Sequence, residues 1–255
     1  MTARAGTTIA VLGLGEAGGA LARDLVAAGA VVRGYDPAVA ATDGVVDTGS
    51  EADAARGADL VLSVNSASAA VDALTAGLRG VGESAVWADL NTASPGTKRT
   101  LAGIAGGHGA AFADVAIMAP VPGRGLRVPM LATGDAAGRV ADALRPFGAS
   151  IEVMAGPAGL AAERKLLRSV FFKGMAAAVV EALSAARAAG CEDWLRRLIA
   201  DELTGADAST VDRLVSGSYR HAVRRTAEML EELGVPADVA GAAREHLRRL
   251  SSAAH

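Results

Sequence analysis

Short apolar runs alternate with longer stretches of helical periodicity through residues 7–153. Between the early runs, segments such as EAGGALARDLVAAG and SASAAVDALTAGLRGV place their apolar residues on one side of a helix. The apolar runs have the length of strands and are bounded by turn residues: TTIAVLG, VVRGYD, DLVLSV, AVWADL, AAFADVAIM and VPMLATG. Strands that alternate with helices predict an α/β fold of the Rossmann type, with a doubly wound, mostly parallel sheet covered by helices on both faces.

The pattern changes after Gly156, where the runs of strand type end. The remaining sequence has helical periodicity and is interrupted where Gly, Pro, Asp and Ser gather, at GCED, TGADAS and LGVPAD. We therefore predict two domains, a Rossmann domain over residues 1–155 and an all-α domain over residues 156–255.

Composition excludes several classes of protein. The net charge is −3 and no basic tract occurs, so a nucleic-acid partner is not expected. Cys191 is the only cysteine, which rules out an internal disulfide and a cysteine zinc cluster, and no other metal-ligand spacing is present. The apolar N-terminal run is interrupted by Glu16 and Arg23, so it resembles neither a secretory signal nor a membrane span. We expect a cytoplasmic protein with no metal and no membrane partner.

The first apolar run leads into a glycine-rich turn. Gly13, Gly15 and Gly18 have the spacing G-x-G-x-x-G between a buried strand and an amphipathic helix. In this context the first glycine permits a tight turn, the second lets the backbone approach a pyrophosphate, and the third lets the helix pack closely on the strand. The alternative is that the glycines serve loop geometry alone. The predicted cofactor-binding residues of the turn are Gly13, Leu14, Gly15, Glu16, Ala17 and Gly18.

The second apolar run ends in GYDP, which places Asp36 at the end of a strand. A carboxylate there accepts hydrogen bonds from the adenosine ribose hydroxyls of NAD and repels the 2′-phosphate of NADP. Arg33 precedes Asp36 by three residues and therefore lies on the opposite face of the strand. The sequence thus favours NAD as the cofactor over NADP.

Four motifs occur in one order: the glycine turn, SVNSASAA after the third strand, DLNTASP after the fourth, and GPAGLAAERK at the domain junction. Together they resemble the β-hydroxyacid dehydrogenase family, which includes 3-hydroxyisobutyrate and 6-phosphogluconate dehydrogenases. FADVAIMAPVPGRGLRVPMLATG and SYRHAVRRTAEM are similar to bacterial members with a short helical domain. The resemblance implies an NAD(P)-dependent oxidoreductase that transfers a hydride between nicotinamide and the hydroxyl or carbonyl carbon of a small substrate, which can be anionic.

The same resemblance assigns roles to individual residues. It implies that Val64 and Asn65 line the adenine side of the cleft and that Asn91 and Thr92 lie near the nicotinamide. It implies that Lys165 is the general acid/base that handles the proton of the substrate hydroxyl. NTASP is also typical of a helix cap, and the two roles are compatible because a cap at the carboxyl end of a strand faces the ligand crevice.

Lys165 opens a polar stripe on the first helix of the second half. Residues four and eight apart share a helix face, so Lys165, Ser169 and Lys173 line up, with Arg168 beside them. A lysine whose pKa is lowered by burial and by neighbouring cations can act as a base near neutral pH. The alternative is that these lysines are solvated, as lysines on helices usually are. The apolar residues of the same segment are predicted to pack elsewhere: Leu166, Leu167, Val170 and Phe171.

Two departures from the family pattern bear on the substrate. Ser169 stands where the family usually has an asparagine, four residues after its lysine. The family stretch D-A-P-V-S-G-G offers a serine hydroxyl and glycine amides to a carboxylate, and DVAIMAP replaces it here. Met118 has no strong donor and Pro120 has no N–H. The candidate substrate-binding residues are Met118, Arg168, Ser169, Lys173 and His221, and other candidates for binding an anion are Arg124 and Arg127.

Two other functions stay open. An imine reductase shares the architecture, although relatives with that activity usually lack the lysine. A non-catalytic dinucleotide sensor would bind its ligand with the first domain and a protein partner with the second. The long apolar helices of the second domain predict a homodimer, since a helical domain of this size often buries such surface against a second copy.

Overall fold

The computed structural model describes residues 6–204, 230 and 232–252. The chain divides into two compact units, Met1–Arg168 and Ser169–His255. The division falls inside helix α6 (Leu160–Ala188), whereas the predicted domain boundary at residues 155 and 156 lies shortly before that helix and stays a prediction. Among the residues described, no helix combines the length and the apolar character that crossing a bilayer requires.

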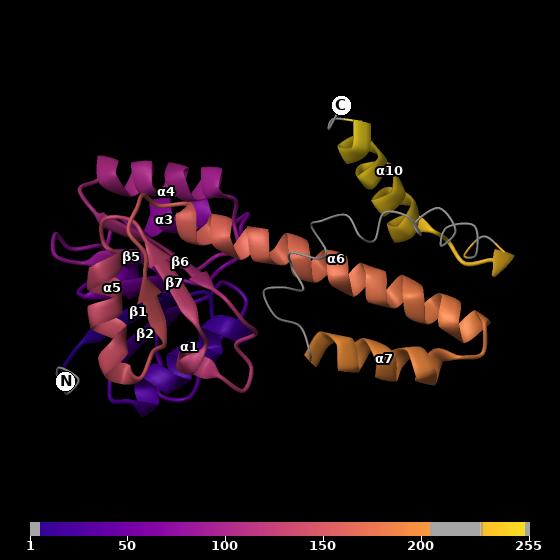
Figure 1. Ribbon diagram of the computed structural model, residues 1–255. Coiled ribbons are helices and arrows are strands. Elements are labelled where there is room, and N and C mark those ends of the chain that lie inside the picture. The colour runs from indigo at the N-terminus through magenta and orange to yellow at the C-terminus, as the bar shows by residue number, and fades with distance from the viewer. Residues whose placement is uncertain (1–5, 205–229, 231, 253–255) are drawn as a thin grey trace. The chain divides into compact units, whose positions relative to one another are not determined.

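An eight-stranded sheet forms the centre of the first unit (Figure 1). Its strand order is β3-β2-β1-β4-β5-β6-β7-β8, and all neighbours are parallel except the antiparallel pair β6–β7. The predicted mostly parallel Rossmann sheet is confirmed, and each of the six predicted runs forms a strand. The two short edge strands, β3 and β8, lack a long apolar run that would have predicted them. The strands are β1 (Thr8–Leu12), β2 (Val31–Tyr35), β3 (Val46–Asp47), β4 (Leu60–Ser63), β5 (Val86–Asp89), β6 (Ala111–Ile117), β7 (Met130–Thr133) and β8 (Ile151–Val153).

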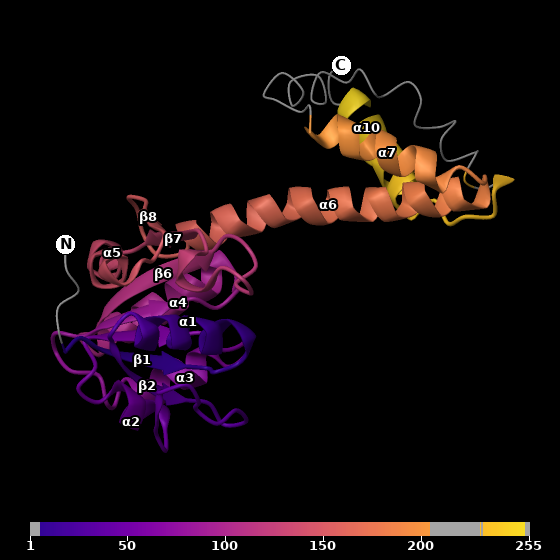
Figure 2. The ribbon, with the colours of Figure 1, turned by 90° about the horizontal axis from the view of Figure 1, so that it is seen from below.

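Helices cover both faces of this sheet (Figure 2). Alternate strand residues enter the two cores, so that Val11 packs on the side of α1 and α5 and Leu12 packs on the side of α2, α3 and α4. Because both faces are buried, the strands read as nearly continuous apolar runs in the sequence. The helices are α1 (Glu16–Ala27), α2 (Glu51–Ala55), α3 (Ala70–Gly77), α4 (Pro95–Gly107) and α5 (Ala137–Leu144), with short 3₁₀ helices at Gly125–Arg127 and Arg145–Phe147.

A row of buried polar side chains crosses four neighbouring strands. The register places Ser63 beside Asp89, Asp89 beside Asp114, and Asp114 beside Thr133. All four side chains are inaccessible to solvent. Buried polar groups are costly unless they are hydrogen bonded, so this row requires partners from the surrounding elements.

The first turn of α6 supplies some of these partners. Asp114 Oδ2 accepts hydrogen bonds from the N–H groups of Gly159 and Ala162, both at 3.0 Å. Thr133 Oγ1 accepts one from the N–H of Ala161 at 3.2 Å. The first N–H groups of a helix have no partner within the helix, and here side chains of the sheet satisfy them. The start of α6 therefore takes its position from β6 and β7.

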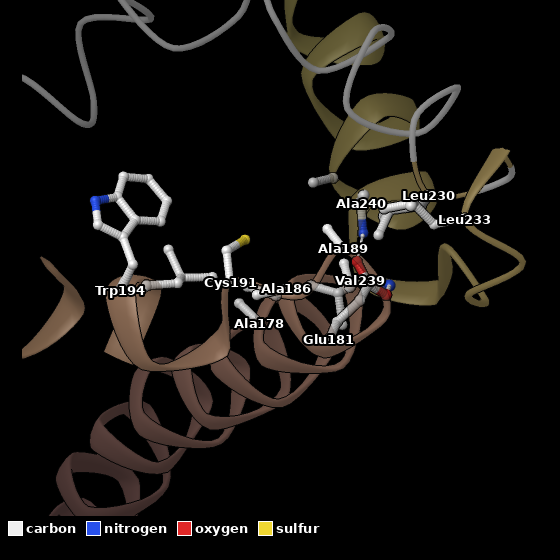
Figure 3. Close-up of a pocket in the computed structure, with 14 residues that line it drawn as sticks. Ala178, Glu181, Ala186, Ala189, Cys191, Trp194, Leu230, Leu233, Val239 and Ala240 are labelled. Carbon is white, nitrogen blue, oxygen red and sulfur yellow. Dashed lines mark hydrogen bonds between the residues drawn. The ribbon is translucent and has the colours of Figure 1, made fainter. Parts of the chain in front are cut away.

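In the second unit, the structure describes the rest of α6 together with α7 (Glu192–Thr204) and α10 (Asp238–Ser252), which confirms the predicted helical second half. Glu181 of α6 accepts hydrogen bonds from the N–H groups of Val239 at 2.6 Å and Ala240 at 2.9 Å, so it caps the N-terminus of α10. An apolar pocket of about 510 Å³ lies among these helices, and its lining includes Trp194 and Leu230 (Figure 3).

Candidate active site

The glycine turn lies between β1 and α1. Gly13 has a left-handed φ of 93°, and its N–H donates to Tyr35 O at 2.9 Å. A Cβ at Gly13 would lie 2.5 Å from Val64 O, and one at Gly18 would lie 1.9 Å from Gly13 O. At Gly15, the N-cap of α1, no described atom lies within 4 Å of where a Cβ would stand. The turn therefore has no room for a side chain at Gly13 or Gly18, whereas the space beside Gly15 is free. There the first N–H groups of α1 can bind an anion.

Asp36 links this turn to the end of β2 by a hydrogen bond. Its Oδ2 accepts a hydrogen bond from the N–H of Leu14 at 2.8 Å, and its Oδ1 accepts from Ala38 at 2.8 Å and Val39 at 3.0 Å. The sequence pattern does not indicate this anchoring role. A carboxylate oxygen can accept more than one hydrogen bond, so anchoring the turn is compatible with the predicted contact to a ribose.

Polar side chains gather at the carboxyl ends of β4 and β5. Asn91 Nδ2 donates to Asp89 Oδ2 at 2.7 Å and to Ser63 Oγ at 3.2 Å, and Asn65 Nδ2 donates to the same Ser63 Oγ at 3.1 Å. Asn91 is 4 % exposed, and its Oδ1 has no hydrogen-bond partner among the described residues. Buried amide oxygens without a donor are uncommon. This buried oxygen therefore lies without a donor near the carboxyl ends of the strands, the side on which ligands of such folds bind.

Lys165 meets the loop that follows β5. Its Nζ donates to Thr92 Oγ1 at 2.7 Å, which joins two residues that the sequence analysis assigned to one site. The Lys165 side chain is half-buried. Burial lowers its pKa below the ordinary value of 10.5, the Lys98 ammonium lowers that pKa further, and the Asp114 carboxylate raises it in part. This direction of shift is the one that proton transfer near neutral pH requires.

A buried ion cluster that the sequence analysis did not identify adjoins this contact. Lys98 of α4 is 1 % exposed, and its Nζ donates to Asp89 Oδ1 at 2.6 Å and to Asp89 O at 2.7 Å. The same nitrogen lies 3.0 Å from Asp114 Oδ1, out of line for a hydrogen bond. The signal available in the sequence was an aspartate at matched positions of two adjacent strands, in AVWADL and AAFADV.

The predicted substrate-binding residues are distributed over both units. Met118 is half-buried just after β6, and its N–H donates to Pro129 O at 2.8 Å. Arg168 ends the first unit, whereas Ser169 and Lys173 belong to the second. Their contacts with substrate stay predictions. The remaining candidate, His221, lies outside the described residues.

Three apolar residues of α6 that were predicted to pack are exposed. The exposed fractions are 56 % for Leu167, 74 % for Val170 and 59 % for Phe171. The expectation that these side chains pack is therefore contradicted for the part of the chain that the structure describes. All three residues lie on one continuous helix, Leu160–Ala188.

Two family models match the chain. Residues 8–156, more than half of the sequence, match the NAD binding domain of 6-phosphogluconate dehydrogenase. Residues 186–250 match a domain of unknown function. The first match covers the whole sheet with the glycine turn and Asp36, and it confirms the predicted family resemblance and nucleotide-binding domain.

Solved structures with the same fold span nearly the whole chain. A conserved hypothetical protein from Sinorhizobium meliloti is 30% identical, with 95% of this chain and 87% of that chain covered and a TM-score of 0.63. A conserved protein of unknown function, described as structurally similar to 3-hydroxyacid dehydrogenases, is 28% identical, with 96% and 97% covered and a TM-score of 0.64. An imine reductase from Myxococcus stipitatus in complex with NADP⁺ is 20% identical, with 97% and 95% covered and a TM-score of 0.83. A variant of that imine reductase has been solved with NAD⁺, so similarity of fold does not distinguish the two cofactors.

Proposed function

Because the chain belongs to the family of the NAD binding domain of 6-phosphogluconate dehydrogenase, a family of NAD(P)-dependent oxidoreductases, we propose that it transfers a hydride between nicotinamide and the hydroxyl or carbonyl carbon of a small substrate. One observation carries the proposal. Lys165 Nζ, half-buried and with a lowered pKa, is held 2.7 Å from Thr92 Oγ1 beside the carboxyl end of β5. In open α/β sheets, this end of the strands is where ligands bind.

The residues present fit a dinucleotide. The space at Gly15 and the N-terminus of α1 suit a pyrophosphate, and Asp36 at the end of β2 suits the adenosine ribose. When bound, the nicotinamide supplies the acceptor or donor of the hydride.

Lys165 moves the proton at its Nζ. In alcohol oxidation its neutral amine takes the proton from the hydroxyl oxygen of the substrate, while a hydride leaves the carbon that bears this oxygen for the nicotinamide. In carbonyl reduction its ammonium gives a proton to the carbonyl oxygen of the substrate. Thr92 Oγ1 accepts a hydrogen bond from Nζ and so orients the nitrogen. Partial burial of Lys165 lowers its pKa, which raises the fraction of neutral amine near pH 7.

The cofactor is proposed to be NAD rather than NADP, because Asp36 carries a carboxylate at the end of β2 and the ion pairs found among the described residues do not include it. Arg33, the nearest cation in sequence, donates from Nη2 to Asp53 O at 2.8 Å, on the side of α2. A 2′-phosphate would therefore meet a carboxylate without a compensating charge.

The substitution Asp36→Asn is expected to raise the ratio of NADPH affinity to NADH affinity about tenfold, since it removes a like charge from the site of the 2′-phosphate. The asparagine keeps one oxygen that can accept from the Leu14 N–H, whereas its amide nitrogen cannot accept from the N–H groups of Ala38 and Val39. Fluorescence titration with both cofactors measures the ratio. Asp43→Asn, which removes an exposed carboxylate from the following loop, is the control. An unchanged ratio in Asp36→Asn would remove the basis for preferring NAD.

The chain is also proposed to form a homodimer through its second unit. Val170 and Val180 of α6 are 74 % and 65 % exposed, and Phe171 stacks edge to face on Phe172 at a ring distance of 5.2 Å while 59 % of it stays exposed. Monomeric soluble proteins seldom leave so many large apolar side chains of one helix in water. A second copy of the same helix offers the complementary surface, as symmetric dimers do.

The double substitution Val170→Glu/Phe171→Glu is expected to convert the dimer into a monomer, because it would place two charges in the proposed apolar interface. Sedimentation velocity measures the mass of the wild type and the variant at equal concentration. Val153→Glu, which introduces the same charge at an exposed valine of the first unit, should leave the mass unchanged. A wild-type chain that sediments as a monomer would contradict the proposal.

A substrate panel followed by NADH absorbance tests the reaction type. Turnover of alcohols or ketones that depends on Lys165 is the expected result. Turnover of imines that is independent of Lys165 would favour the imine reductase alternative. The similarity in fold to the Myxococcus stipitatus enzyme supports that alternative. Tight NADH binding without turnover of any class would favour the non-catalytic sensor.

A further inference from the structure

Lys98 is one of only three lysines in the chain, together with Lys165 and Lys173. Its ammonium is buried between two carboxylates, those of Asp89 and Asp114. A buried ion cluster is weak evidence for stability, because apolar side chains of similar volume often serve as well in the same place. The position of this cluster in the site indicates another role.

Two segments form the Lys165–Thr92 contact, and each of them adjoins one of the two carboxylates. Asp89 is the last residue of β5, and the Thr92 loop follows it directly. Asp114 accepts hydrogen bonds from two N–H groups at the beginning of α6, the helix that carries Lys165. Lys98 binds the carboxylate and the backbone oxygen of Asp89 and lies against the free oxygen of Asp114. One ammonium thus bridges the anchors of both segments.

We propose that Lys98 is a positioning residue for hydride-transfer chemistry at this site: by bridging Asp89 and Asp114, it holds the Thr92 loop and the start of α6 at a fixed separation and so places Lys165 Nζ. The inference rests on the proposed function of Lys165. Lys98 is fully buried and exchanges no proton with the substrate, so it acts through the two carboxylates alone.

The same cluster sets the charge around Lys165. The Lys98 ammonium lowers the pKa of Lys165, and the Asp114 carboxylate raises it. Asp89 adds a second carboxylate from β5, paired with Lys98. Removing the charge of Lys98 should therefore raise the pKa of Lys165, and removing the charge of Asp114 should lower it. The charged neighbours on the same helix, which the variants below leave in place, are Glu163, Arg164 and Arg168.

The ionisation of Lys165 can be followed directly in the full-length protein. With lysine labelled at ¹³Cε, the NMR spectrum contains three lysine signals. The signal that is missing from the spectrum of Lys165→Met belongs to Lys165. In Lys98→Met the midpoint of Lys165 is expected to rise by about one pH unit, and in Asp114→Asn it is expected to fall by about as much. Asparagine can still accept from the N–H groups of α6, so Asp114→Asn preserves the cap. The matched control is Leu101→Ala, one helical turn along α4 and equally buried but without charge, which should lower the melting temperature and leave the midpoint unchanged.

Kinetics give the second readout. Lys98→Met is expected to lower kcat by about 10- to 100-fold with an unchanged KM for NAD, since a displaced Lys165 impairs the chemical step and leaves the glycine turn intact. Leu101→Ala should lower kcat far less. Equal Lys165 midpoints in the wild type, Lys98→Met and Asp114→Asn would overturn the inference, and so would equal kcat losses in Lys98→Met and Leu101→Ala. Where Lys98→Met does not fold, kcat of Asp114→Asn decides, because this variant removes one of the two carboxylates that Lys98 bridges, and a loss no larger than that of Leu101→Ala would overturn the inference. Wild-type activity in Lys165→Met would instead overturn the proposed function, and the NMR midpoints would still report on Lys98.

Discussion

Replacing Lys165 by methionine is expected to lower kcat for alcohol oxidation by about 10²- to 10⁴-fold, the usual contribution of a positioned general acid or base. Methionine keeps most of the apolar volume of the lysine stem but cannot accept or donate the proton. The affinity for NADH should stay the same, because the described contacts of the glycine turn and Asp36 do not involve this side chain. Steady-state kinetics and NADH fluorescence titration measure the two quantities separately.

The pH dependence has a definite sign. Since the pKa of Lys165 is lowered from 10.5, the neutral amine that oxidation requires is present at a lower pH than for an exposed lysine. In the wild type, kcat/KM for oxidation should therefore rise with pH to a plateau with a midpoint below 10.5, and the rate of carbonyl reduction should fall through the same midpoint. Lys165→Met should abolish this dependence in both directions.

Arg164→Met provides the control for the loss of a cation. Arg164 is the neighbouring residue on α6, and its exposed side chain lies 3.8 Å from Glu163. This variant should keep the wild-type kcat and pH profile. Oxidation that survives in Lys165→Met with the wild-type profile would show that the proton leaves by another route.

The second large effect is expected in the glycine turn, where one alanine substitution should lower the stability of the fold and another should weaken the binding of NADH. A Cβ at Gly18 would lie 1.9 Å from Gly13 O, so Gly18→Ala requires α1 to move off the turn. We expect a loss of about 3 kcal/mol in the free energy of unfolding. Gly15→Ala meets no described atom within 4 Å and has an ordinary φ of −62°, so it should fold normally. Its methyl group would enter the space of the pyrophosphate and weaken NADH binding by about 10- to 100-fold.

Thermal unfolding and NADH titration on both variants separate the two effects. Gly103→Ala is the control, because it lies within α4 with open space around it and should stabilise the protein by about 0.5 to 1 kcal/mol without changing affinity. A Gly15→Ala variant that binds NADH as tightly as the wild type would place the pyrophosphate somewhere other than the turn.

Much of the first unit could be predicted from local pattern. The strands are buried on both faces and therefore appear as apolar runs, and Gly13 and Gly18 appear because a side chain at either would collide with backbone. β3 and β8 could not be predicted, since two or three residues at a sheet edge carry no periodicity. The exposure of Val170 and Phe171 was not predicted, because the apolar character of a residue does not by itself reveal whether its side chain is buried.

The candidate site, too, contains residues that sequence motifs predict and residues that only the tertiary structure reveals. Lys165 and Thr92 could be assigned to one site from motifs alone, although they are far apart in sequence, because both motifs belong to one family pattern. The ion cluster of Lys98, Asp89 and Asp114 could not, since it depends on the register between β5 and β6 and on the face that α4 turns to the sheet. The anchoring role of Asp36 was missed for a similar reason, because a hydrogen bond from the Leu14 N–H cannot be inferred from the residue type.

A crystal structure of the protein with bound NAD⁺ tests the central claim most directly. The account predicts that the pyrophosphate lies over Gly15 and that the nicotinamide ring lies beside Thr92, with Lys165 Nζ separated from ring carbon C4 by no more than the width of one small substrate. A ring bound at a distance from Thr92, with the Lys165 nitrogen directed into bulk water, would contradict the assignment of Lys165 as acid and base and leave only the binding of the dinucleotide.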